Sequence, residues 1–239
     1  MSLETIWKNF LKDILENGET HEKDDGDILR ESLINHCFIP NVLNQFGNQN
    51  ITTEKFLDLI QQGVFNIEGY PVKDIALYDY VTSLDNPEII NNENPDGSEK
   101  FTYTYPNRIF NMTDEHSNFT INQFVLMKDR LTKWVGSNRA VANIYSGVKD
   151  SHMNDIPCLQ ILQATIRNNE LILHCYFRSN DCYGAFPSNM LFLNYLGLKL
   201  VDELKNSYPN LKFKGISYNS SSLHIYKNDI DAAKKVVGL

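Results

Sequence analysis

A stretch from Asp155 to Asn189 combines one thiol with several groups that bind anions and polar rings. Cys158 follows a proline and can act as a nucleophile. Arg178 and Ser179 can hold a phosphate, because a guanidinium and a hydroxyl both donate hydrogen bonds to its oxygens. Asn189 carries an amide that can meet the polar edge of a base. These residues indicate covalent chemistry on an anionic, hydrogen-bonding substrate.

Four short motifs lie in order along the C-terminal half of the chain. They are Pro157-Cys158-Leu159, Phe177-Arg178-Ser179-Asn180-Asp181, Ala185-Phe186-Pro187-Ser188-Asn189 and Ser222-Leu223-His224-Ile225-Tyr226. In this order and spacing they resemble the thymidylate synthase and pyrimidine nucleotide hydroxymethylase family, although each motif alone is a weak signal. Leucine after the cysteine is similar to the archaeal-type branch. The resemblance implies an α/β (α+β) fold with a large mixed β-sheet flanked by helices, in a single domain of residues 1–239.

The resemblance also implies a substrate, a one-carbon donor and a partner. The substrate is a pyrimidine nucleoside 5′-monophosphate, and the donor is 5,10-methylenetetrahydrofolate. Cys158 would add to carbon 6 of the ring as a thiolate, which a cation such as Arg178 favours. The implied contacts are Arg178 and Ser179 with phosphate, Asp181 and Asn189 with the base or its surroundings, and His224 and Tyr226 with the sugar 3′-hydroxyl. In the implied homodimer, Arg139 reaches the partner's site.

The base preference rests on Asn189. Uracil-type members of the family have asparagine at the matching position, and the phage cytosine hydroxymethylases have aspartate. Because an amide can turn over to suit cytosine, asparagine alone predicts only a soft preference for uracil.

The chain departs from the family pattern in three places. The polar run from His21 to Asp27 has Lys23 where an arginine is expected, and Asn138 replaces the first arginine of the pair that ends with Arg139. Arg108, in a segment similar to one that lines the nucleotide pocket, is a candidate to compensate. No glutamate matches the family's proton-handling acid, for which Asp74 is the first candidate and Asp79 the second.

Plainer interpretations compete with each of these roles. Cys158 could be a buried core thiol, Asp74 an exposed helix acid, and His224 with Tyr226 ordinary strand residues. The segment 101–110 alternates aromatic residues with threonines, as a strand and turn would. The departures from the family pattern also leave open a nucleotide-binding protein without turnover.

The expected product depends on the C-terminal end. The usual thymidylate synthases close over folate with an aliphatic tail, whereas this sequence ends at AAKKVVGL soon after Tyr226. Water that enters the site would give a hydroxymethyl group in place of a methyl group. The sequence therefore slightly favours a nucleotide 5-hydroxymethylase acting on CMP, dCMP or dUMP. Thymidylate synthase proper, supported by Asn189, is the alternative.

Composition excludes several other classes of protein. A net charge of -8 argues against a nucleic-acid-binding surface. No apolar run is long enough to cross a membrane, and the acidic, amphipathic N-terminus is unlike a targeting peptide. The four cysteines form no Cys-x-x-Cys pair, and the histidines lack the spacing of metal ligands, so we expect a cytoplasmic protein with reduced thiols and no bound metal.

Hydrophobic periodicity predicts the elements that position the site. Helices are expected at 5–16, 54–62 with Thr53 as the N-cap, 122–134, and 189–204. Strands are expected at 31–40, 140–145, 171–177 and 217–226, with a tight turn at Asn168-Asn169. A further helix beginning at Pro71 and a loop over residues 86–100 complete the prediction.

Overall fold

The computed structural model describes residues 1–47, 52–72, 78, 103–114, 119–153 and 155–239. Its centre is a six-stranded sheet in the order β1-β2-β8-β7-β6-β5. These strands are β1 (Glu19–Glu22), β2 (Ile28–Pro40), β5 (Val141–Asn143), β6 (Leu159–Arg167), β7 (Glu170–Asp181) and β8 (Lys212–Tyr226). Neighbouring strands are antiparallel except for β7 and β8, which are parallel. The predicted mixed sheet is therefore confirmed.

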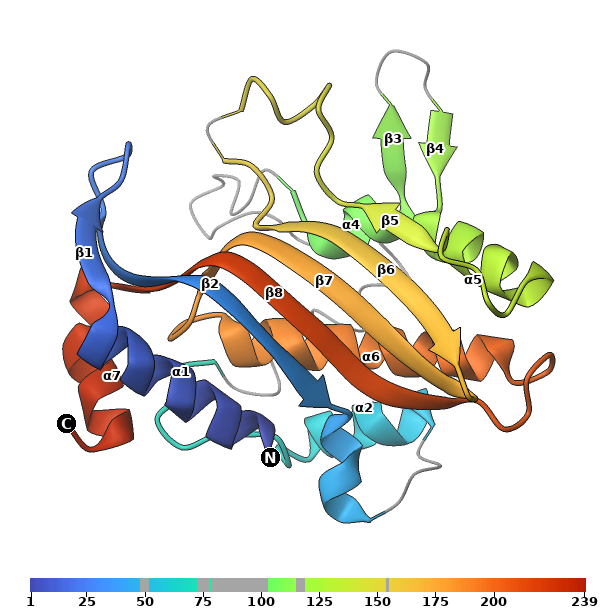
Figure 1. Ribbon diagram of the computed structural model, residues 1–239, viewed down its shortest axis with the longest axis horizontal. Helices are drawn as coiled ribbons and strands as arrows, with labels where there is room; N and C mark the ends of the chain where they lie inside the picture. Colours follow the sequence, from blue (N-terminus) through green and yellow to red (C-terminus); the bar gives the residue numbers. More distant parts are fainter. Residues whose placement is uncertain (48–51, 73–77, 79–102, 115–118, 154) are drawn as a thin grey trace.

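Two connections explain how β7 comes to lie between β6 and β8. Asn168 and Asn169, which join β6 to β7, both have positive φ angles (53° and 59°), the conformation of a tight hairpin turn. The parallel pair β7 and β8 needs a longer crossover, which α6 (Phe186–Leu204) provides. Figure 1 shows α6 running along one face of the sheet.

The core lies between α6 and the sheet. Most of α6 is buried, and alternate residues of β7 are buried with it, as the period of a strand requires. Gly197 of α6 lets the ring of Phe213 pack against the helix backbone, because a Cβ atom at this position would overlap that ring.

Other helices surround this core. They are α1 (Leu3–Asn17), η1 (Val42–Phe46), α2 (Thr53–Gln61), α4 (Tyr105–Phe110), α5 (Gln123–Lys133), η3 (Lys227–Asp229) and α7 (Ile230–Val237). A two-stranded ribbon of β3 (Met112–Asp114) and β4 (Phe119–Ile121) lies between α4 and α5 in the sequence. Trp7 of α1 is fully buried and donates from Nε1 to the carbonyl of Cys182, 2.6 Å away, which ties α1 to the end of β7.

The structure differs from one local prediction and from one of the plainer interpretations of the sequence. Thr52, not Thr53, caps α2 by accepting the N–H of Lys55, because the Thr53 hydroxyl donates instead to Asp202 at 2.5 Å. Residues 105–110 form helix α4 and not a strand, since Thr104 caps the segment and Pro106 fits its first turn. Helices α1, α5 and α6 are confirmed with slightly different ends.

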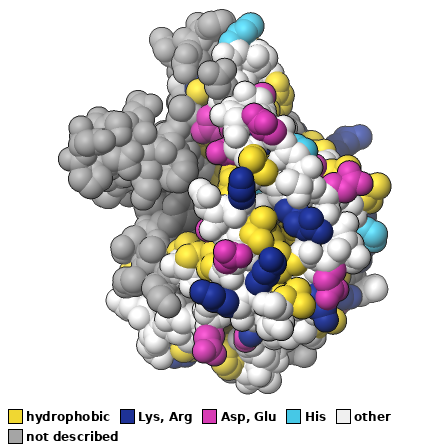
Figure 2. Space-filling model, turned by 90° about the vertical axis from the view of Figure 1, so that its left-hand side faces the viewer, with side chains coloured by type: hydrophobic (Ala, Val, Ile, Leu, Met, Phe, Trp, Pro, Cys, Tyr) yellow, Lys and Arg dark blue, Asp and Glu magenta, His cyan; other side chains and the backbone are white. Residues whose placement is uncertain are grey.

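Several predictions lie outside the described residues. These are the helix expected from Pro71 onwards, with Asp74 and Asp79, and the loop expected over residues 86–100. In the described part of the chain, no helix combines the length and apolarity that a membrane crossing demands. On the face occupied by α1, α7 and β1, Lys and Arg side chains are interspersed with Asp and Glu (Figure 2).

Candidate active site

Cys158 lies immediately before β6, where the pairing with β7 sets its neighbours. Its carbonyl accepts the N–H of Arg178 at 2.8 Å, and its Sγ lies 3.6 Å from the Oγ of Ser179. The side chain is only half-buried. The sheet therefore brings the predicted nucleophile next to the predicted phosphate ligands and leaves it accessible.

The guanidinium of Arg178 is braced against the backbone before Cys158. Its Nη2 donates to the carbonyl of Ile156 at 2.6 Å, and its Nε donates to the carbonyl of Pro157 at 3.2 Å. Its Nη1 lies 3.4 Å from the Oγ of Ser179. These contacts fix a positive charge beside the sulfur, at a place where an anionic ligand can be held.

A tyrosine that the sequence prediction missed completes this corner. The hydroxyl of Tyr103 accepts the N–H of Cys158 at 3.4 Å and lies 3.5 Å from the carbonyl of Ile156. Burial, with a smaller contribution from nearby Cys158, raises the pKa of Tyr103, so the hydroxyl keeps its proton at neutral pH. The run of alternating aromatic residues in FTYTYP was the available signal, but it did not say which ring faces the thiol.

Parallel pairing of β7 with β8 adds His224 and Tyr226. His224 is the register partner of Asp181, and its ring meets that of Tyr226 edge to face at 5.1 Å. The ring is buried, and its Nε2 has no hydrogen-bond partner among the described residues. A buried polar nitrogen without a partner is costly. The role expected for His224, a contact with a sugar hydroxyl, remains a prediction.

Other side chains set the protonation of His224. Burial, and then the positive charges of Lys23, Arg178 and His21, lower the pKa of His224 to about 4. The Oγ of Ser222 donates to a carboxylate oxygen of Glu31 and lies 3.5 Å from Nδ1 of His224. Because the Ser222 hydroxyl donates its hydrogen bond to Glu31, it can only accept a hydrogen bond from Nδ1–H of His224. The neutral ring then carries its proton on Nδ1, and Nε2 is an acceptor.

Lys23 contributes to the same positive region. Its Nζ lies 5.6 Å from the centre of the Tyr226 ring and is paired with Asp25 at 2.6 Å. Of the groups that act on His224, His21 and Lys23 come from the β1–β2 segment and Arg178 comes from β7. Lys23 also lies 3.7 Å from Asp27, so two carboxylates offset part of its charge.

Asp181 holds the turn that leads into α6. Its Oδ1 accepts the N–H groups of Tyr183 and Gly184, both at 3.0 Å, and a Cβ atom at Gly184 would overlap the carboxylate. Burial raises the pKa of Asp181 to about 6. The carboxylate thus hydrogen bonds to the backbone just before α6. Its contact with a base remains a prediction.

Asn189 lies in the first turns of α6. Its Nδ2 donates to Oδ1 of Asn180 at 2.9 Å, and Nδ2 of Asn180 donates to the hydroxyl of Tyr218 at 3.2 Å. The predicted base-recognition residue is therefore anchored to β7 and β8 through a buried asparagine that was not singled out from the sequence.

The two remaining predicted arginines are placed differently. Arg108 is buried and pairs through Nη2 with Asp150 at 2.5 Å, while Asp150 also accepts the N–H of Ser146 at 2.7 Å. Arg139 is exposed in the turn between α5 and β5. Neither makes a hydrogen bond or ion pair with Cys158, Arg178 or His224 in the part of the chain that the structure describes. Their roles toward phosphate remain predictions, as does that of Asp74.

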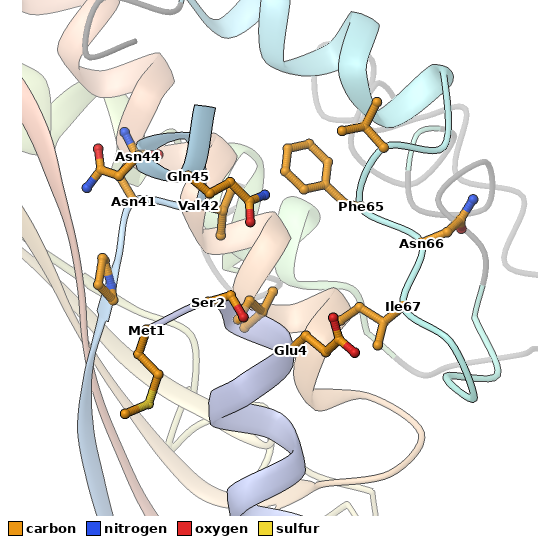
Figure 3. Close-up of a pocket in the computed structure, with 13 residues that line it drawn as sticks. Met1, Ser2, Glu4, Asn41, Val42, Asn44, Gln45, Phe65, Asn66 and Ile67 are labelled. Atoms are coloured by element: carbon orange, nitrogen blue, oxygen red, sulfur yellow. The ribbon is translucent and has the colours of Figure 1, made fainter. Parts of the chain in front are cut away.

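A separate cavity of about 390 Å³ lies between the start of α1, η1 and residues 64–67. Figure 3 shows Ser2, the N-cap of α1, and Glu4 of α1 on one side of it and Phe65 and Ile67 on another. It contains none of the predicted site residues. Over the described ranges, no three His, Cys, Asp or Glu side chains are arranged to hold a metal ion.

Buried, neutral His224 predicts a pH-dependent stability. The pKa of His224 in the folded protein is about 4, below the ordinary 6.5. The unfolded chain therefore takes up the proton first as the pH falls, and the folded state loses roughly 3 kcal/mol between pH 6.5 and 4. We expect the free energy of unfolding of His224→Asn, relative to that of wild type, to rise by about this much as the pH falls from 6.5 to 4. Urea titrations at several pH values measure this difference.

Asp181 titrates in the same window with the opposite sign, because its pKa is raised. Its ionisation disfavours the folded state as the pH rises from 3.8 to about 6. Since it is present in both proteins, its contribution cancels in the difference. The exposed His152 gives the matched control, His152→Asn. A His224→Asn difference that stays flat between pH 6.5 and 4 would contradict this interpretation.

Comparison with known proteins agrees with this geometry. Residues 5–238 match the family model described as "Thymidylate synthase". Three similar proteins, each named "Putative thymidylate synthase", come from methanogens: from Methanothermobacter marburgensis at 25% identity (97% of this chain, 93% of the relative), from Methanocaldococcus jannaschii at 30% identity (70% and 71%), and from Methanopyrus kandleri at 23% identity (96% and 92%). These relatives support the archaeal branch, and the match over nearly the whole chain shows that the protein belongs to the thymidylate synthase family.

Proposed function

We propose that the protein transfers a one-carbon group to carbon 5 of a pyrimidine nucleoside 5′-monophosphate through a covalent bond between Cys158 and carbon 6. The observation that carries this proposal is the joint placement of three groups. A half-buried thiol lies 3.6 Å from a hydroxyl and beside a braced guanidinium, and a buried histidine nitrogen without a partner lies on the neighbouring strand.

The nucleotide would be held at three points. Arg178 and Ser179 offer donors for the phosphate, with positive charge added by Lys23. Nε2 of His224 would accept a hydrogen bond from a sugar hydroxyl, and the ring of Tyr226 packs against the imidazole ring of His224. At the base end are Asn189 and the turn held by Asp181. Arg139 would reach the partner's phosphate in a homodimer, as the family resemblance implies. Arg108 stays a candidate contact of the nucleotide, and it pairs with Asp150.

The thiol changes the reactivity of the ring. When sulfur bonds to carbon 6, the electron pair of the carbon 5–carbon 6 double bond moves toward the oxygen (uracil) or nitrogen (cytosine) on carbon 4, and carbon 5 becomes nucleophilic. After carbon 5 has bonded to the one-carbon unit, carbon 5 would lose its proton and the bond between that unit and the donor nitrogen would break, which leaves a methylene group on the ring. Water would then add to this methylene for a hydroxymethyl product, or hydride from the reduced folate for a methyl product. The sulfur–carbon 6 bond breaks as the ring double bond returns, and Cys158 is regenerated. The hydroxyl of Tyr103, which keeps its proton next to Cys158, can donate a hydrogen bond in this region.

Members of this family generally use 5,10-methylenetetrahydrofolate, which supplies the one-carbon group when bound. The chain offers a suitable surface, because the rings of Tyr103 and Tyr105 lie 6.0 Å apart beside the backbone of Cys158 and Leu159. A flat ring could stack there next to the nucleotide. We include this donor in the proposal.

Two products remain within the proposal. The sequence predicts a hydroxymethyl group, whereas the names of the similar proteins from methanogens favour the methyl group of a thymidylate synthase. A third candidate, a nucleotide-binding protein without turnover, is favoured by the substitution of Asn138 for an arginine and by the pairing of Lys23 with Asp25.

Removing the thiol separates catalysis from binding. With a pyrimidine nucleotide labelled with tritium at carbon 5, we expect Cys158→Ala to release tritium at least roughly a thousandfold more slowly than wild type, because the adduct cannot form. Cys37→Ala is the matched control, since Cys37 is also half-buried but lies on β2, and burial raises its pKa to about 11. Release that survives in Cys158→Ala would rule out the adduct, and a wild type that binds nucleotide without release would support the non-catalytic alternative.

Product analysis decides between the two transfer reactions. Wild-type protein is incubated with each candidate nucleotide and 5,10-methylenetetrahydrofolate labelled in the one-carbon unit, and the nucleotide is weighed by mass spectrometry. A hydroxymethyl product is expected if water enters the site. A methyl product together with dihydrofolate would show hydride transfer and would establish the synthase alternative.

A further inference from the structure

The carboxylate of Asp181 has one oxygen that the fold uses and a second that it leaves available. Oδ1 accepts the N–H groups of Tyr183 and Gly184, both at 3.0 Å, which holds the turn before α6. Within the described ranges, no residue donates a hydrogen bond to Oδ2. This second oxygen lies over Gly184, where a Cβ atom would overlap it. The turn therefore fixes the carboxylate through Oδ1 and makes room for Oδ2.

Strand geometry places this carboxylate close to the predicted nucleophile. Ser179, whose Oγ lies 3.6 Å from Sγ of Cys158, comes two residues before Asp181 in β7. Residues two apart in a strand point to the same side of the sheet and lie about 7 Å apart. Burial is the main reason that the pKa of Tyr226 is raised, and charges on Asp181 and Cys158 add to the rise, so both groups face this ring. A pyrimidine bonded to the sulfur would therefore extend to within reach of Oδ2, directly or through one water.

The surroundings of Asp181 prepare this carboxyl to take up a proton near neutral pH. Burial raises its pKa to about 6, the backbone bonds from Gly184 and Tyr183 oppose the rise, and the like charge of Asp229 adds to it. The carboxyl is therefore mostly ionised at pH 7. A base is most effective when its pKa lies near the working pH, because it can then both accept and release the proton.

The other titratable side chains around Asp181 are uncharged at that pH. His224, its register partner in β8, has a lowered pKa of about 4. Burial raises the pKa of the remaining four, which are Tyr70, Cys182, Tyr183 and Tyr226. The two cations of the region are Arg178, three residues before Asp181, and Lys23, which is paired with Asp25. In the described part of the chain, neither cation forms an ion pair with Asp181, so no such pair holds its pKa down.

The proposed reaction requires a group that takes up a proton. After the one-carbon unit has bonded to carbon 5, that carbon must lose its proton before the ring double bond can return. The candidates from the sequence, Asp74 and then Asp79, both lie outside the described residues. We propose that Asp181 is the catalytic residue that accepts the carbon 5 proton, and that it does so on Oδ2. The inference rests on the proposed nucleotide function, for which it supplies the base.

The proton transfer conserves atoms and electrons. The carbon 5–hydrogen bond breaks and its electron pair stays on the ring, while the proton bonds to Oδ2 and turns the carboxylate into a carboxylic acid. The electron pair then forms the double bond to the one-carbon unit, as the bond from that unit to the donor nitrogen breaks and the nitrogen keeps the electrons of that bond. The carboxylic acid later releases its proton to water, which restores the base.

Asp181→Asn separates removal of the proton from binding and from adduct formation. The asparagine oxygen can still accept from Tyr183 and Gly184, but the amide cannot take up a proton. With 5,10-methylenetetrahydrofolate and dUMP or dCMP labelled with tritium at carbon 5, we expect release at least roughly a hundredfold slower than in wild type. With fluorine at carbon 5, the adduct on Cys158 forms without loss of a proton, so its rate of formation should stay near that of wild type. The dissociation constant of the nucleotide should also stay unchanged.

The pH dependence gives a second test that leaves Asp181 in place. Tritium release by wild type should slow as the pH drops through about 6, because the protonated carboxyl cannot accept a proton. Asp229→Asn removes the like charge that helps to raise the pKa of Asp181, so this fall should move to lower pH. Release at pH 5 should then be roughly twofold faster than in wild type, the effect of a few tenths of a pKa unit.

Asp231→Asn is the matched control for Asp229→Asn. Asp231 is an exposed aspartate of α7, two residues further along the chain, and its replacement should keep the wild-type profile. The side chain of Asp229 makes no capping hydrogen bond, so α7 should persist without its charge. The rate of adduct formation with the 5-fluoro nucleotide, measured over the same pH range, separates the ionisation of Cys158 from that of Asp181.

Three results would overturn the proposal in distinguishable ways. If wild type is active and Asp181→Asn releases tritium as fast, another group takes the proton, and the proposed function stands without this inference. If adduct formation and nucleotide binding weaken in step with release, Asp181 is a binding residue and not the base. If wild type neither releases tritium nor forms the adduct, the proposed function fails and the inference fails with it. Circular dichroism and urea unfolding first establish that each variant is folded, and the Asp229→Asn profile decides the question if Asp181→Asn is not.

Discussion

The register of β7 between its two neighbours is the constraint on which the site depends. The antiparallel pairing with β6 places Cys158 beside Arg178 and Ser179, and the parallel pairing with β8 places His224 beside Asp181. A slip of one residue in either pairing would turn these side chains to the opposite face of the sheet. The hairpin turn at Asn168-Asn169 fixes the first register, and α6, packed along the sheet, fixes the second.

Burial then gives the collected side chains their chemical character. The low pKa of His224 keeps the imidazole neutral, and the bond from Ser222 to Glu31 leaves its Nε2 as an acceptor. The raised pKa of Tyr103 keeps a proton beside the sulfur. Positive charge is supplied locally by Arg178 and Lys23, although the whole chain is acidic. Folding thus sets the acceptors, donors and charges before any ligand arrives.

The sequence predicted the parts of this site that lie within single motifs. The order of the Cys158, Arg178 and His224 motifs indicated the family and the mixed sheet, and hydrophobic periodicity predicted α6 closely. It could not identify Tyr103 or Asn180, because their roles arise from contacts between elements that are distant in the sequence. Arg108 was expected at the phosphate, but only the fold shows that Asp150, far along the chain, pairs with it. Local capping by Thr104 overrode the alternating pattern that resembled a strand.

The central claim is that Cys158 forms a bond to carbon 6 of the nucleotide, and trapping that bond tests it most directly. With fluorine in place of hydrogen at carbon 5, no proton can leave after the one-carbon group has been added, so the adduct should persist. The protein is incubated with a 5-fluoropyrimidine nucleotide and 5,10-methylenetetrahydrofolate, and the intact protein and its peptides are weighed. The account predicts added mass on the peptide that contains Cys158. Wild-type protein that binds the nucleotide without gaining mass, or added mass that persists in Cys158→Ala, would contradict it.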